Sequence, residues 1–175
     1  MIYTFRFISD EQDSFVLDVN INHDQTFEQM QDTIQEALDY DPSHMASFFV
    51  SNNEWEKLEE ITIMDMGADI PVKNMSETLI QDCFFEKNQR ILYVFDFFAE
   101  RIFFGSVIRM IDAEPPIDLP TVSLLQGKIP AQLIANQNLD VDFLNSIDYS
   151  DELDSEGDDM MDYIDDMESF DESDY

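Results

Sequence analysis

The feature that most limits the fold of this chain is the stretch from Arg90 to Ile111, which reads RILYVFDFFAERIFFGSVIRMI. The part from Arg90 to Phe98 is apolar on both faces of an extended chain, which is typical of a central strand. The apolar residues resume at Ile102, so we expect an antiparallel partner strand after a short turn. Gly105 interrupts this second run and predicts a β-bulge or a close approach of two backbones.

Asp96 lies within this stretch, among six aromatic residues between Tyr93 and Phe104. The short side chains of turn residues often accept hydrogen bonds from main-chain N–H groups nearby, and buried polar groups need such partners. We therefore expect Asp96 to have a structural role at the turn between the two strands rather than a chemical one.

The first forty residues predict a hairpin followed by a helix. Apolar and polar residues alternate from Ile2 to Ile8 and from Phe15 to Ile21, which is the period of strands with one buried face. From Thr26 to Tyr40 the spacing changes to three and four, which predicts an amphipathic helix with Thr26 or Asp24 as its N-cap. The helix should end at Asp41–Pro42, because proline disfavours a helical residue before it.

The remaining pattern predicts shorter elements. We expect strands at Ala46–Ser51, Glu60–Met64 and Thr121–Gln126, a loop at Gly67–Asn74, and a short helix opened by Ser76. The fold class is therefore α+β, a mostly antiparallel sheet built from hairpins and packed with two helices. We expect one domain over residues 1–135, followed by an acidic, flexible tail over residues 136–175.

The net charge of −32 is unevenly distributed over the 175 residues. The segment Asn136–Tyr175 holds 16 of the 40 acidic residues and no Lys or Arg, so it carries about half of the net charge. Direct binding to nucleic acid is disfavoured, because affinity for phosphate depends on Lys and Arg. The same argument disfavours anionic membrane surfaces. We expect a cytoplasmic protein, because the opening residues are neither a signal peptide nor a membrane span.

The acidic segment also contains apolar residues that would lie on one face of a helix or near it: Met160, Ile164, Met167 and Phe170. Alternating acidic and apolar residues are typical of segments that fold on contact with a partner. We consider a solvated tail and a tail that docks on this domain or on a basic partner surface. Glu152, Asp154 and Glu156 resemble part of a calcium loop, but Tyr163 stands where a bidentate Glu is needed.

Residues able to carry chemistry are few. The two histidines, His23 and His44, have no paired spacing, and no metal, phosphate-binding or nucleophile motif is present. Cys83 is the only cysteine; it excludes an internal disulfide, fits a reducing compartment and is expected to pack in the core. Trp55 is expected to pack at the core or its rim. We predict no catalytic residue, no bound metal and no cofactor.

Two stretches together resemble signatures of the plasmid open-reading-frame-three-like family, named after a root-inducing plasmid and also labelled insertion-element passenger TnpR. The first signature resembles TFEQMQDTIQEALDYDPSHMASF, and the second resembles YVFDFFAERIF. A Pro-Pro pair followed by an acidic residue comes next in the family. The matching positions are Thr26, Ile34, Ala37, Asp41, His44, Phe48, Tyr93, Asp96, Phe97, Pro115 and Pro116.

Other positions depart from the signatures, and most of the family's His and Asp side chains there are changed to Gln, Ala or Phe. Met30 and Gln31 stand where the family has Leu and His, and Asp39 and Tyr40 stand where it has Gly and Trp. In the second signature the family's Gly, Asp, Trp and His are replaced by Phe98, Ala99, Arg101 and Phe103. The resemblance covers roughly residues 1 to 135. It implies an α+β fold and no particular reaction, and a resolvase is disfavoured because no nucleophilic Ser stands among arginines with a basic DNA-binding segment.

Three functions are open at this point. The first is a non-catalytic protein-binding or adaptor module whose acidic tail engages a basic protein. The second is a hydrolase or metal-dependent enzyme that uses the remaining polar residues, such as His44 and Asp96. The third is a DNA-mimic inhibitor, in which carboxylates imitate phosphates. The sequence leaves the oligomeric state open.

Overall fold

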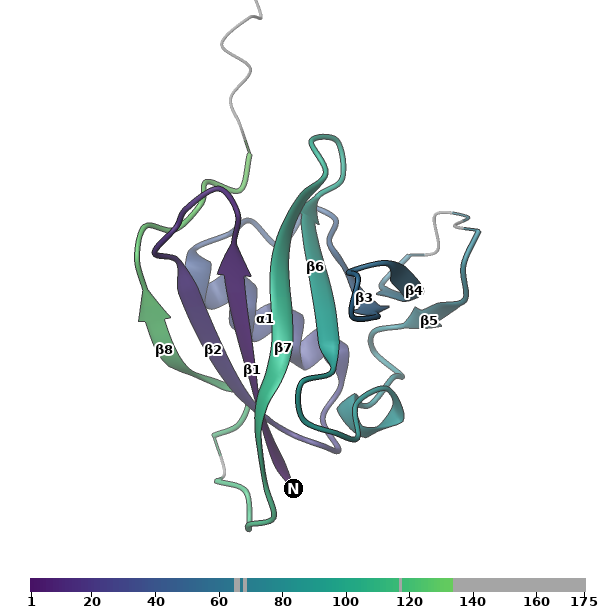
Figure 1. The fold of residues 1–175 in the computed structure, drawn as a ribbon, viewed down its shortest axis with the longest axis vertical. Helices are drawn as coiled ribbons and strands as arrows, with labels where there is room; N and C mark the ends of the chain where they lie inside the picture. Colours follow the sequence, from purple (N-terminus) through teal and green to yellow (C-terminus); the bar gives the residue numbers. More distant parts are fainter. Residues whose placement is uncertain (65–66, 68, 117, 134–175) are drawn as a thin grey trace, which may run out of the picture. The chain divides into compact units, whose positions relative to one another are not determined.

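The structure, a computed structural model, describes residues 1–64, 67, 69–116 and 118–133. Its strands are β1 (Ile2–Ser9), β2 (Val16–Asn22), β3 (Ser47–Ser51), β4 (Lys57–Thr62), β5 (Val72–Asn74), β6 (Arg90–Asp96), β7 (Arg101–Ile111) and β8 (Thr121–Gln126). They form one sheet in the order β5-β4-β3-β6-β7-β1-β2-β8. All described pairs are antiparallel except β4–β5. The α+β class is confirmed, with β6 and β7 as neighbours near the middle of the sheet (Figure 1).

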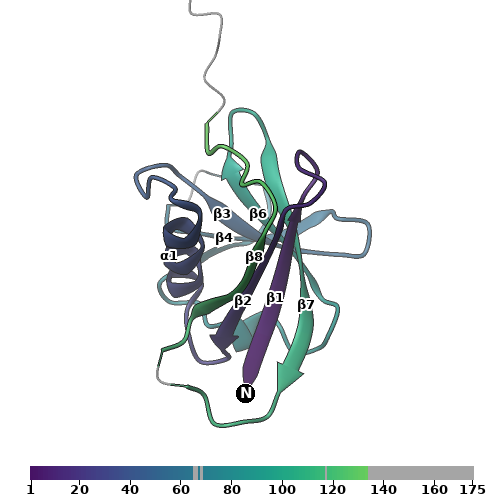
Figure 2. The same cartoon turned by 90° about the vertical axis from the view of Figure 1, so that its left-hand side faces the viewer.

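The helix α1 (Phe27–Leu38) packs on one face of this sheet (Figure 2). Thr26 is its N-cap: the Thr26 hydroxyl accepts from the Gln29 N–H at 3.3 Å, and the Gln29 side chain accepts from the Thr26 N–H at 3.0 Å. This reciprocal capping box satisfies two donors that the first turn leaves open. The helix ends earlier than predicted, because Asp39 adopts the left-handed conformation with φ 55°.

The core lies between α1 and the sheet and is rich in aromatic rings. The Phe48 ring lies 5.6 Å from that of Phe27 on the helix and 4.7 Å from that of Tyr93 on β6. Phe95 and Phe103 continue the layer on β6 and β7, with ring centroids 4.4 Å apart. The large side chains buried to less than 2% exposure are Tyr93, Phe5, Phe7, Phe15, Phe27, Phe48, Phe84, Phe95, Phe103, Leu17, Ile21 and Met30.

The prediction of a second helix, opened by Ser76, is wrong. Only a 3-10 turn, η1 (Ile80–Asp82), forms there, and α1 is the single α-helix of the described residues. The N–H groups of Ile80 and Gln81 donate to the Gln25 and His23 carbonyls, each at 3.0 Å, instead of to the preceding turn. A helix needs those donors for its own carbonyls, so the contact with the segment before α1 prevents it.

The Gly67–Asn74 stretch, predicted as a loop, contains strand β5. It pairs in parallel with β4, with Glu60 opposite Val72 and Thr62 opposite Asn74. Three residues are too few to show a period of two, and for this reason the pattern gave no signal. No helix within the described residues has both the length and the apolar character that crossing a membrane requires.

Gly105 on β7 marks a close approach, one of the two predicted alternatives. A Cβ atom at this position would lie 2.6 Å from the Ile91 side chain and 2.6 Å from the Phe7 ring. Both neighbours are fully buried: Ile91 lies on β6 and Phe7 on β1, the two strands that pair with β7. The absence of a side chain at Gly105 therefore lets Ile91 and Phe7 meet over β7.

Gly105→Ala should destabilise the protein by about 1–3 kcal/mol, because the added methyl group overpacks the core between Ile91 and Phe7. Urea unfolding measures this loss, with Ser106→Ala on the opposite face of β7 as the matched control. An unchanged unfolding midpoint for Gly105→Ala would show that the close approach is absent.

Candidate functional site

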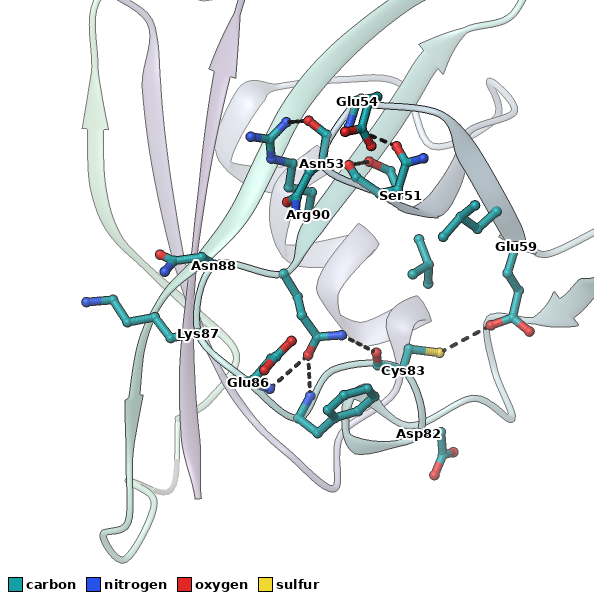
Figure 3. A pocket seen from close by; sticks show the side chains of 15 residues that line it. Ser51, Asn53, Glu54, Glu59, Asp82, Cys83, Glu86, Lys87, Asn88 and Arg90 are labelled. Carbon is teal, nitrogen blue, oxygen red and sulfur yellow. Dashed lines mark hydrogen bonds between the residues drawn. The ribbon is translucent and has the colours of Figure 1, made fainter.

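Among the pockets that the described residues line, two bear on function, and the larger of these two is an open depression of about 710 Å³ (Figure 3). It lies between the β3–β4 turn and the segment from Asp82 to Arg90. Its polar groups are largely engaged with one another. The Arg90 side chain donates to the Asn53 carbonyl, and the Gln89 amide oxygen accepts from the N–H groups of Phe85 at 2.6 Å and Glu86 at 2.8 Å.

Cys83 borders this depression but is not set up as a nucleophile. Its sulfur lies 3.8 Å from the Glu59 carboxylate and 3.7 Å from the Lys73 ammonium, and these two charged groups form an ion pair of 3.0 Å. Burial raises the pKa of the Cys83 thiol to about 11, against the opposing effect of Lys73. A thiol that stays protonated at neutral pH is a poor nucleophile. Cys83 is buried, as the sequence predicted.

The smaller pocket, of about 170 Å³, lies where β3 begins and β4 and β6 end. Ser47, the first residue of β3, pairs with Thr62 on β4 and with Val94 on β6. The start of β3 therefore lies beside the ends of β4 and β6, at the same end of the sheet. The loop between α1 and β3 and the residues after β4 and β6 complete the wall. The pocket is lined by Gln31, Pro42, Ser43, His44, Met45, Ala46, Ser47, Thr62, Ile63, Met64 and Phe97.

Two residues that line this pocket carry buried side-chain atoms without a hydrogen-bond partner among the described residues, Gln31 Oε1 and Ser47 Oγ, and both atoms are closed to solvent. Gln31 projects from α1 and is 3% exposed, and Ser47 is 1% exposed. Leaving such a group unpaired typically costs about 1–3 kcal/mol, so each one requires an explanation. By contrast, the Thr62 hydroxyl of the same pocket donates to the Met64 carbonyl at 3.1 Å.

The mouth of this pocket is apolar and open to solvent. Met45, Ile63 and Met64 are 48%, 54% and 62% exposed, and together with the half-buried Phe97 they form what we call the apolar rim. Phe98, the next residue, is 99% exposed. Clustered exposed apolar side chains on an otherwise charged protein mark interaction surfaces.

Asp96 closes the turn between β6 and β7, as predicted from the sequence. Its Oδ1 accepts from the N–H groups of Phe98 at 3.0 Å and Ala99 at 3.1 Å. Asp96 is 7% exposed and does not belong to the described lining of either pocket. Its carboxylate is therefore used to hold the turn that carries Phe97 and Phe98.

Arg101 anchors the same end of the sheet, and the sequence reasoning missed it. Its guanidinium is 6% exposed and donates twice to the Glu11 carboxylate, at 2.6 and 2.7 Å. It also donates to the Gln132 carbonyl at 3.1 Å, lies 3.9 Å from Asp96 and sits 4.8 Å from the centre of the Phe95 ring. The charge of Arg101 directly before an apolar run was a signal of a buried pair, but Glu11 lies ninety residues away in the sequence.

The positions that match the family signatures have different roles in the structure. Thr26 caps α1, and Ile34, Phe48 and Tyr93 lie in the core. Ala37 is half-buried on α1, and Pro115 and Pro116 are exposed between β7 and β8. Only His44 and Phe97 meet in the smaller pocket, and Gln31, which stands where the family signature has His, joins them.

Asp41 lies next to this pocket and helps to fix its loop. It accepts the Ser43 N–H at 2.8 Å, and its carbonyl accepts the His44 N–H at 3.2 Å. Hydrogen bonding by Ser43 holds the pKa of Asp41 below its usual value. The Gln132 side chain bonds both the N–H and the carbonyl of Asp41, at 2.7 and 2.9 Å.

Other predicted positions lie outside the described residues. These are Met160, Ile164, Met167 and Phe170 of the acidic segment and the residues that resemble a calcium loop. Within the described part of the chain, no group of three or more His, Cys, Asp or Glu is arranged to hold a metal ion.

Asp96→Leu should lower the free energy of unfolding by about 1–3 kcal/mol, because the N–H groups of Phe98 and Ala99 lose their acceptor. Asp96→Asn keeps an acceptor oxygen and should cost about 1 kcal/mol. Urea unfolding compares both with Asp112→Asn, which removes an exposed negative charge of the same chain. Equal midpoints for Asp96→Leu and the wild type would mean that the turn does not depend on this carboxylate.

Comparisons with known proteins agree with the fold. The family model described as plasmid pRiA4b ORF-3-like protein matches residues 8–175, so the match extends beyond Ala135, where the resemblance had been placed to end. No curated protein matches this chain. A crystal structure of MM3350 from Methanosarcina mazei Go1, described as a protein of unknown function, is 18% identical with a TM-score of 0.55. The match covers 71% of this chain and 68% of the MM3350 chain. At this identity the likeness concerns the fold alone. By its match over residues 8–175, the chain belongs to the plasmid pRiA4b ORF-3-like family.

Proposed function

We propose that this protein is a non-catalytic, cytoplasmic protein-binding or adaptor module that docks a partner with a basic surface. The observation that carries this proposal is the apolar rim around the smaller pocket. Methionine side chains are unbranched and polarisable, so they adapt to different partner surfaces. Two of the four rim residues are methionine.

The charge of the chain supports a basic partner. The chain has 40 acidic and only 8 basic residues. Several of these bases are already matched with carboxylates inside the protein: Arg6 with Asp18 at 2.7 Å, Lys73 with Glu59 at 3.0 Å and Arg101 with Glu11 at 2.6 Å. The surplus of negative charge steers positively charged proteins toward the surface and repels acidic ones.

The acidic segment Asn136–Tyr175 is part of the proposal on the basis of its sequence. Its 16 carboxylates favour the same class of partner as the rest of the chain. Met160, Ile164, Met167 and Phe170 would supply apolar contacts there. The segment thus adds to the proposed docking of a basic protein without requiring any reaction.

The other two hypotheses have less support. An enzyme that uses His44 and Asp96 needs both groups near one substrate, but His44 lines the smaller pocket and Asp96 holds a turn. A DNA mimic is motivated by the net charge alone, and the apolar rim is not a feature that imitates phosphate. Both remain predictions that no specific observation favours.

A photo-cross-linking residue placed at Met64 should capture a basic protein in cells of the source organism. The same residue at Phe85, which is 71% exposed on the other pocket, is the positional control and should not capture that protein. The partner is identified by mass spectrometry and purified for binding measurements. Absence of a Met64-specific adduct, or an acidic partner, would contradict the proposal.

Replacing Ile63 and Met64 together by serine should weaken binding of the purified partner at least about tenfold, because the partner loses its apolar contacts. The matched variant replaces Leu58 and Phe85, which are exposed apolar residues of the larger pocket, and should change affinity less than about twofold. Equal effects of the two double variants would rule out the apolar rim as the docking surface.

A further inference from the structure

The walls of the smaller pocket that a partner can reach are mostly apolar. Met45, Ile63 and Met64 of the apolar rim are each about half exposed at its mouth. The half-buried Phe97 and the exposed Pro42 add further apolar surface to the lining. Small concave sites of this composition hold apolar groups, because both the group and the wall leave water when the group enters.

The polar side chains of the lining offer an occupant few hydrogen bonds. Gln31 Oε1 and Ser47 Oγ are closed to solvent, and the hydroxyl of the buried Thr62 already donates to the Met64 carbonyl at 3.1 Å. Among the described lining residues none is a carboxylate, a lysine or an arginine. A polar or charged group would therefore lose its bonds to water inside the pocket without replacing them, which is costly.

The size of the pocket limits the apolar group further. A volume of about 170 Å³ equals that of roughly five or six water molecules in the liquid, at about 30 Å³ each. The side chain of leucine, isoleucine or methionine has four non-hydrogen atoms, whereas that of tryptophan has ten. An aliphatic side chain thus fits whole, and an indole fits only in part.

An exposed carboxylate lies directly beside this apolar space. Asp41 precedes Pro42, the first lining residue of the loop between α1 and β3. Its Oδ1 accepts the Ser43 N–H at 2.8 Å, and its carbonyl accepts the His44 N–H at 3.2 Å, so the loop that forms the wall also positions the carboxylate. A fixed negative charge beside an apolar pocket matches a partner segment in which a basic residue adjoins an apolar one.

We infer that the smaller pocket receives one aliphatic side chain of the partner, while Asp41 pairs with a lysine or arginine next to it. This inference rests on the proposed function and names the feature of the basic partner that the apolar rim surrounds. The aliphatic side chain supplies the buried contact, and the cation beside it distinguishes basic from acidic segments.

The test is a titration of full-length protein, labelled with ¹³C at the methionine methyl groups, with acetyl-leucyl-lysine amide at millimolar concentrations. Met45 and Met64 line the pocket and are direct reporters, while Met110 on β7 is the internal control. We expect saturable shifts of Met45 and Met64 and no shift of Met110.

Three related probes separate the two parts of the recognised feature. Acetyl-asparaginyl-lysine amide keeps the shape of the leucine but not its apolar character, and it should bind at least about fivefold more weakly. Acetyl-leucyl-glutamine amide lacks the cation and should bind about two- to threefold more weakly. Acetyl-tryptophyl-lysine amide tests the size limit and should bind more weakly than the leucyl probe.

Two pairs of variants assign these effects to the pocket and to Asp41. Ile63→Ser should weaken binding of the leucyl-lysine probe at least about threefold, whereas Leu58→Ser, at an exposed position of the larger pocket, should change it less than about twofold. Asp41→Asn keeps an acceptor for the Ser43 N–H and should abolish the preference for lysine over glutamine. Asp39→Asn removes an equal charge at an exposed position two residues earlier and should keep that preference.

Several results would overturn the inference. These are equal binding of the leucyl and asparaginyl probes, stronger binding of the tryptophyl probe, equal effects of Ile63→Ser and Leu58→Ser, or no shift with any probe. A lysine preference that survives Asp41→Asn would overturn the role of Asp41. An unchanged Met110 signal in each variant confirms an intact fold.

These outcomes are separate from those that test the proposed function. If the rim variants weaken binding of the captured partner but the probes are not distinguished, the inference fails alone. If the leucyl-lysine probe binds as expected but the partner is insensitive to the Ile63 and Met64 changes, the proposed docking surface fails instead.

Discussion

The packing of aromatic rings between α1 and the sheet is the interaction on which the described structure depends. Phe27 on the helix meets Phe48 on β3, which in turn meets Tyr93 on β6, at ring distances of 5.6 and 4.7 Å. Burial of such large rings supplies much of the driving force for folding. It also fixes the helix across the strands, so Gln31 on the same helix reaches the pocket where β3 begins.

Polar contacts at one end of this aromatic layer determine how the loops are held. Arg101 joins Glu11 of the β1–β2 connection to the carbonyl of Gln132, and Asp96 closes the β6–β7 turn next to it. A buried guanidinium is tolerated only when its donors are satisfied, and here Glu11 and the Gln132 carbonyl accept from it while Asp96 adds a negative charge 3.9 Å away. Phe97 of the apolar rim is thus carried by a turn whose ends are fixed, which suits a preformed binding surface.

Much of the fold could be predicted from local pattern, and most of the site could not. The alternation in β1 and β2, the stripe of α1 and the turn role of Asp96 all follow from neighbouring residues. The helix predicted at Ser76 does not form, because the N–H groups of Ile80 and Gln81 donate to the carbonyls of Gln25 and His23. No local pattern reveals this contact. The pocket likewise combines Gln31, Met45 and Met64 from three separate segments, and only the strand order brings these together.

We propose above that this family member functions by docking a protein at the apolar rim. Hydrogen exchange of the full-length protein, measured with and without its captured partner, tests this claim most directly. We predict slowed exchange at residues 42–47, 62–64 and 97, which line the smaller pocket, and at residues 98–99 of the adjoining turn, with little change at residues 82–90 of the larger pocket. Protection confined to residues 82–90, or to the β8 edge, would contradict it.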